Sequence, residues 1–139
     1  MPNITVLRHL RQLPVIFAWR IGILFASKTL HWNIVVCDVT STQSKHGDCF
    51  ARDVGSVLDD FAMTSPQLLQ RAQQYVHYIA RAEINSRFEY FSSSRLLLLR
   101  VDYESGDVNL RNSIRRDIVE ATTLAHLADL KDRPDSGNP

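Results

Sequence analysis

A long, largely apolar segment between Val15 and Val39 constrains the fold of this chain more than any other feature. It is rich in Val, Ile, Phe and Trp, the residue types that favour β-strands, and both alternate sets of its side chains are apolar. The segment predicts two strands, near residues 20–26 and 31–39, paired as a hairpin. Because strands that are apolar on both sides must be covered on both, we expect this hairpin to lie centrally in a sheet.

Helical periodicity follows in most of the remaining chain. Apolar residues recur at helical spacing in four stretches: 3–13, 48–61, from 66 to between 85 and 90, and from Asp107 or Asn109 onward. Ser65-Pro66 marks the start of the third stretch, because Pro is favoured at the first helical position. Residues 96–104 end in a clean alternation of apolar and charged side chains, which predicts a third strand with one face in water.

These elements predict an α+β fold in which a three-stranded, mainly antiparallel sheet, made of the apolar hairpin and one later strand, is covered by three to four helices. A chain of 139 residues can bury one core without disulfides or a structural metal. We therefore expect residues 1–131 to form a single α+β domain. Residues 132–139 are polar and contain Pro and Gly, which predicts a disordered C-terminal tail.

The charge of the chain is nearly balanced overall but uneven along its length. There are 16 Lys and Arg against 15 Asp and Glu, yet residues 1–37, 38–60, 61–101 and 102–139 carry net charges of +4, −3, +3 and −3. Segments of alternating sign can neutralise one another after folding, which argues against a uniformly basic surface for nucleic acid. The sequence still allows a local basic face, since 13 of the 16 bases are arginine, which favours bidentate contacts.

Two groups of basic residues are candidates for binding a partner or nucleic acid. One belongs to the last predicted helix and the other to the long helix after Pro66: Arg111, Arg115 and Arg116, and Arg71, His77 and Arg81. A helix dipole disfavours cations in its first turns by about 0.3–1 kcal/mol each, so the first group needs nearby negative charge. We expect Asp107, Asp117 and Glu120 to supply it; a bound phosphate or an acidic partner is the alternative.

His46 and Cys49 are the only weak candidates for catalysis or metal binding. Two such residues in a loop could supply half of a tetrahedral zinc site, or a thiolate and its base with Asp38 or Asp48 as orienting carboxylate. His31 and Cys37 lie about 20 Å apart on one predicted strand, which is too far for both to complete a metal site with His46 and Cys49. We therefore predict no catalytic set, no metal site and no cofactor.

The sequence predicts no membrane span. Its longest apolar run, residues 13–26, would rise only about 21 Å as a helix, short of the ~30 Å hydrocarbon core of a bilayer. The first 37 residues are free of acids and carry arginines, as organellar transit peptides do. We expect an intracellular protein, with organellar targeting as the alternative.

With no catalytic constellation in the sequence, three classes of function stay open. We expect a small non-enzymatic interaction protein or accessory subunit that acts through charged helix faces and binds a protein partner or further copies of itself. The first alternative is an RNA- or DNA-binding module that uses the arginine-bearing helices. The second is a hydrolase that depends on Cys and His, or a metal-binding protein.

Overall fold

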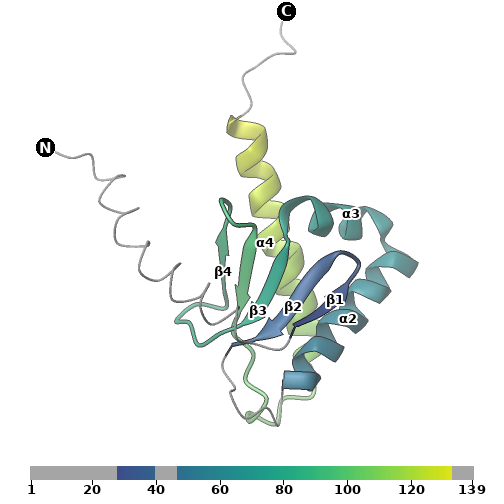
Figure 1. Ribbon diagram of the computed structural model, residues 1–139, viewed down its shortest axis with the longest axis vertical. Helices are drawn as coiled ribbons and strands as arrows, with labels where there is room; N and C mark the ends of the chain where they lie inside the picture. Colours follow the sequence, from purple (N-terminus) through teal and green to yellow (C-terminus); the bar gives the residue numbers. More distant parts are fainter. Residues whose placement is uncertain (1–27, 40–46, 133–139) are drawn as a thin grey trace, which may run out of the picture.

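One mixed β-sheet packed against three helices makes up the part of the chain that the computed structural model describes, residues 28–39 and 47–132 (Figure 1). In chain order the elements are β1 (Lys28–His31), β2 (Ile34–Asp38), α2 (Gly47–Thr64), α3 (Pro66–Tyr75), β3 (Tyr78–Arg81), β4 (Phe88–Phe91), β5 (Leu96–Leu99) and α4 (Leu110–Asp132). None of these helices is both long and apolar enough to cross a bilayer.

The sheet has five strands in the order β1-β2-β3-β5-β4. Its three central strands, β2, β3 and β5, run parallel, and each outer strand pairs antiparallel with its neighbour. The prediction of a three-stranded, mainly antiparallel sheet is therefore wrong, whereas the α+β class is confirmed. The error arises because two of the five strands, β3 and β4, lie in the stretch that the sequence analysis assigned mostly to a helix.

The long predicted helix after Pro66 ends early, at Tyr75. Val76 takes an extended conformation, with φ −127° and ψ 123°, and its N–H closes the helix by donating to the carbonyl of Ala72. Ile79 and Ala82 continue the helical spacing of the apolar residues but are buried in and just after β3. A four-residue strand carries too few positions to separate the two periodicities, so the pattern alone favoured the wrong element.

A hairpin is present within residues 28–38, but it is not the predicted pairing of residues 20–26 with 31–39, and it is not central, because β1 is an outer strand of the described sheet. Leu30 of β1 pairs with Val35 of β2, and the turn between them places Trp32 and Asn33 at φ 54° and 65°, as a two-residue type I′ turn requires. The Trp32 indole N–H donates to Asp59 at 2.8 Å, which fastens the turn to α2. The predicted helix over 3–13 and strand over 20–26 lie outside the described residues.

The predicted helix over 48–61 and the final helix are confirmed as α2 and α4. The prediction for the third strand is only partly right. β5 covers Leu96–Leu99, and all four of its leucines are buried, so it has no wet face. β5 lies between β3 and β4, and its leucines pack on both faces of the sheet, which explains why the strand is apolar throughout.

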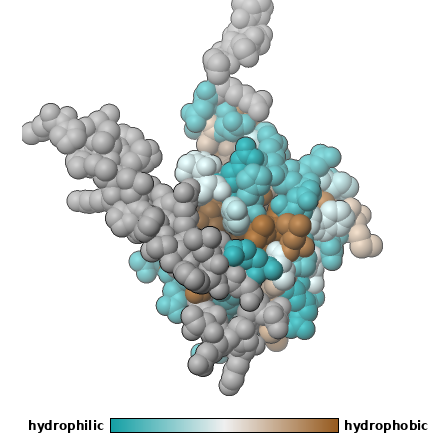
Figure 2. Space-filling model, viewed as in Figure 1, coloured by the Kyte–Doolittle hydropathy of each residue, from teal (hydrophilic) through white to brown (hydrophobic). Residues whose placement is uncertain are grey.

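All three helices pack on one face of the sheet. Side chains from alternate positions of the central strands, including Val36, Ile79 and Leu97, form the main core with Phe50 and Phe61 of α2. The opposite face carries a second apolar cluster, made of Cys37, Ala80, Ala82, Leu96 and Leu98. Figure 2 shows hydrophobic side chains exposed over the β1–β2 hairpin, where Leu30 is 66 % exposed.

Candidate interaction surface

Arg81 is bound within the fold at the end of β3. Its guanidinium contacts Asp38 at the end of β2 at 2.9 Å and donates to the carbonyl oxygen of Val101 at 2.7 Å. It also stacks on the Tyr103 ring, with 5.1 Å from the guanidinium carbon to the ring centroid. The Arg81 and Asp38 side chains are only 13 % and 4 % exposed. This candidate binding residue therefore links three segments at the carboxyl edge of the parallel strands.

The three arginines in the first half of α4 each have a carboxylate partner. Arg111 pairs with Asp53 at 2.9 Å, Arg115 pairs with Asp60, and Arg116 pairs with Asp117 at 3.4 Å. Asp53 and Asp60 belong to α2, so most of the neutralising charge comes from another helix, whereas the sequence analysis expected it from α4 and the turn before it. Arg115 also lies over the Phe61 ring, 5.2 Å from its centroid.

Asp53 also accepts a hydrogen bond from the hydroxyl of Tyr103 at 2.8 Å. Burial is the main cause that raises the pKa of Tyr103, and the contact with Asp53 adds to it. The phenol therefore stays protonated over the physiological range and keeps donating. Together with Arg111, this contact fixes the start of α4 against α2.

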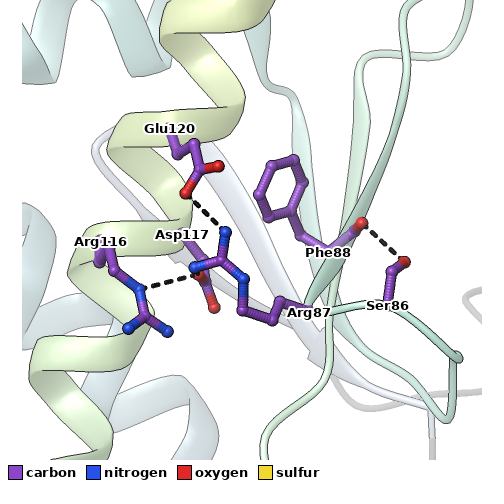
Figure 3. Close-up of polar contacts among 6 residues, drawn as sticks. All are labelled: Ser86, Arg87, Phe88, Arg116, Asp117 and Glu120. Atoms are coloured by element: carbon purple, nitrogen blue, oxygen red, sulfur yellow. Dashed lines mark hydrogen bonds and ion pairs between the residues drawn. The ribbon is translucent and has the colours of Figure 1, made fainter.

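Arg87, just before β4, joins the sheet to α4 (Figure 3). Its guanidinium contacts Asp117 at 3.2 Å and Glu120 at 2.8 Å, and Arg116 approaches Asp117 from the other side. Burial is the first cause that raises the pKa of Asp117, while Arg116 and Arg87 act in the opposite direction. The two arginines thus compensate a carboxylate that the fold removes from water.

The remaining two basic candidates lie on different elements. Arg71 belongs to α3 and approaches the hydroxyl of Thr123 on α4 at 3.4 Å. His77 lies between α3 and β3, and its Nε2 is 3.2 Å from the guanidinium of Arg95. The sequence analysis placed Arg71, His77 and Arg81 on one helix, so the end of α3 at Tyr75 separates residues that were expected to share a surface.

Cys49 lies in the first turn of α2, and His46 is outside the described residues. The Cys49 thiol is partly exposed and accepts a contact from the Arg52 guanidinium at 3.3 Å. Asp38, proposed as an orienting group, is bound to Arg81. Within residues 28–39 and 47–132, no three His, Cys, Asp or Glu side chains converge as metal ligands would.

A hollow of about 570 Å³ lies between α3, β4 and the second half of α4. On its wall the hydroxyl of Tyr75 donates to Asp129 at 3.0 Å and lies 2.9 Å from Nδ1 of His126. The hydroxyl of Tyr90 donates to the backbone carbonyl of Tyr75 at 2.6 Å. These bonds fix which side of α4 turns toward α3. Sequence spacing could have shown that His126 and Asp129 share a helix face, but not that Tyr75 lies opposite them.

Three leucines of α4 are about half exposed, and the first of them, Leu124, also lines this hollow. Leu124, Leu127 and Leu130 are 53 %, 50 % and 48 % exposed. Leu127 follows the buried Ile118 by nine residues, and at about 100° per residue this places it on the opposite side of the helix. We call these three residues the leucine patch. Periodicity did not reveal this patch, because Leu124 and Leu127 flank the apolar stripe of the helix in the sequence.

Comparison with known proteins gives no relative for this chain. No protein-family model matches it, and no curated protein or solved structure reaches a significant match.

Proposed function

We propose that this protein is a small interaction protein or accessory subunit and that it binds its partner through the leucine patch of α4. The observation that carries the proposal is the half exposure of all three leucines at a regular spacing of three residues. Contiguous apolar side chains on the surface of a folded protein commonly mark binding sites. Full burial of a leucine is favourable by about 1.5–3 kcal/mol, so covering the exposed half of each offers about 1 kcal/mol.

Charged residues surround the leucine patch and give it a polar rim. Arg116 and Glu120 precede it on α4, and Lys131 follows it. Rim charges of both signs set the orientation and the rate of association more than its final affinity. The charged helix faces expected from the sequence thus act beside an apolar centre, in the usual arrangement of a protein interface.

The proposal has a direct test in site-specific photo-crosslinking. A photoreactive amino acid at position 127 should form a defined adduct in native extract, and the same group at Gln70, exposed on α3, should not. Adding Leu124→Ser and Leu130→Ser to the position-127 probe should remove the adduct. The identified partner, purified, should then reproduce the same adduct with the purified chain.

Two outcomes would contradict the proposal. Equal labelling from positions 127 and 70 would show that the leucine patch has no preferred partner. An adduct with nucleic acid that disappears steeply with added salt would support the RNA- or DNA-binding alternative in its place.

A further inference from the structure

We propose that the occupant of the leucine patch is a second copy of this chain, bound as an antiparallel pair of α4 helices about a two-fold axis beside Leu127. The inference rests on the proposed function, because it names the partner of the same surface. A two-fold interface uses one surface patch on both subunits, so that surface must be complementary to itself. Both the leucines and the charges around them meet this condition.

The leucines are spaced symmetrically about the middle of the patch. Leu124 and Leu130 lie three residues before and after Leu127. In an antiparallel pair centred on Leu127, the Leu124 of one copy meets the Leu130 of the other, and the two Leu127 side chains meet each other. Because Leu124 and Leu130 lie about 60° to either side of Leu127 around the helix, these contacts require the two helices to cross along their i, i+3 rows.

The charges give the pair its direction. Glu120 precedes Leu127 by seven residues and Lys131 follows it by four, so both lie within about 40° of Leu127 around the helix. At a rise of 1.5 Å per residue, antiparallel pairing leaves Lys131 of one copy only about 4.5 Å along the axis from Glu120 of the other. Parallel pairing would leave them about 16.5 Å apart, beyond the reach of both side chains.

Each copy has room for this contact. Figure 1 shows the last turns of α4 extending beyond the sheet, where a second helix can lie alongside them. Glu120 holds Arg87 at 2.8 Å, yet its side chain is still 43 % exposed, so it can face a second cation. Three half-exposed leucines cover less than the ~800 Å² per partner of a standard interface, so we expect a concentration-dependent dimer.

Reversing the charge of Glu120 or Lys131 tests both the identity of the partner and the antiparallel direction of the two helices. Sedimentation equilibrium should show the wild-type chain dimerising with concentration, and Glu120→Lys or Lys131→Glu alone should weaken the dimer about tenfold, because each variant faces like charges at two places. An equimolar mixture of the two variants should recover the wild-type affinity, since every contact then joins opposite charges. Glu83→Lys, the same change on an exposed residue before β4, should have no effect.

Disulfide trapping gives a second measurement that does not disturb Glu120. With Cys49→Ser to remove the partly exposed thiol, Leu124→Cys and Leu130→Cys chains should cross-link efficiently only when mixed. Cross-linking of each variant with itself would indicate parallel helices and overturn the inference. So would a mixture of charge variants that associates no better than either variant alone.

The failures of the two proposals can be told apart. A wild-type chain that stays monomeric to millimolar concentration, but forms an adduct from position 127 with a different protein, would overturn this inference and support the proposed function. A dimer that forms without any adduct at position 127 would overturn both.

Discussion

The two buried carboxylates of the described fold are each held by an arginine that lies far away in the sequence. Asp38 and Asp117 are the buried carboxylates, and arginines contact both. Arg81 is separated from Asp38 by 43 residues, and Arg87 from Asp117 by 30. Residue types alone predicted that acids would neutralise the arginines, but the partners depend on tertiary packing.

Breaking the Arg81–Asp38 pair should destabilise the fold strongly. Arg81→Ala removes the ion pair to a carboxylate that is only 4 % exposed, together with the hydrogen bond to Val101 and the stacking on Tyr103, which we expect to cost about 3–5 kcal/mol in the free energy of unfolding. Arg111→Ala, on an arginine that is 57 % exposed, should cost under about 1 kcal/mol. Urea denaturation of both variants provides the comparison, and equal losses would contradict the structural role assigned to Arg81.

Cys37 should make the fold sensitive to alkaline pH. Burial, more than any other cause, raises the pKa of its thiol from 9.0 to about 11. The unfolded chain releases this proton first, so the contribution of Cys37 to stability is complete below pH 9 and is lost as pH rises toward 11. We expect a loss of about 2–3 kcal/mol from this group across that interval.

The control for this prediction is Cys37→Ala, which should lose less stability than the wild type between pH 8.5 and 10.5, whatever its stability at neutral pH. The free energy of unfolding at both pH values is the measurement.

In the folded wild type at neutral pH, a thiol reagent should label Cys49 well before Cys37, since only Cys37 is buried. Equal labelling rates would argue against the placement of Cys37.

Among the elements, helices with a clear apolar face were predictable and short strands were not. Eighteen residues of α2 repeat their apolar positions several times, which leaves little doubt about the period. β1, β3 and β4 have four residues each, so apolar positions there fit a strand or one turn of helix equally well. The pairing across the sheet decides between them, and a single sequence does not contain that information.

At Gly55, α2 lies close to β1. A Cβ at this position would lie 2.7 Å from the ring of His31. Alanine in a helix interior is favoured over glycine by about 1 kcal/mol, so Gly55→Ala gains helix propensity but displaces His31. We expect the substitution to be more stabilising in a His31→Ala background than in the wild type, by about 1 kcal/mol. Thermal unfolding of the four chains measures this coupling, and purely additive effects would contradict the contact.

At the scale of the whole molecule, the class of fold was predictable and the topology was not. Apolar hairpin residues, two clear helices and the buried run Leu96–Leu99 are enough to indicate α+β. The parallel alignment of β2, β3 and β5 depends on contacts between residues far apart in the chain. The leucine patch escaped prediction for a similar reason, because periodicity does not show where neighbouring elements cease to cover a helix.

The position of β3 at the centre of the sheet predicts the order of amide exchange. The backbone of β3 is paired on both sides, whereas β1 and β4 are paired on one side only among the described strands. We expect the amides of Ile79 and Ala80 to exchange with deuterium most slowly. The amides of β1 and β4 should exchange faster, through local opening. Native-state exchange followed by NMR tests this, and faster exchange in β3 than in β1 would contradict it.

The strand order also has a consequence for how the chain reaches its native form. Each outer pair of strands is a local hairpin that can zip within microseconds, but the two hairpins have no strand in common. Residues 78–81 must enter between them before the sheet is continuous, and this requires closing a loop of about forty residues from β2. We therefore expect assembly of the central segment to govern the folding rate, and a ribosome-bound chain that has not yet released residues 78–81 cannot complete this sheet.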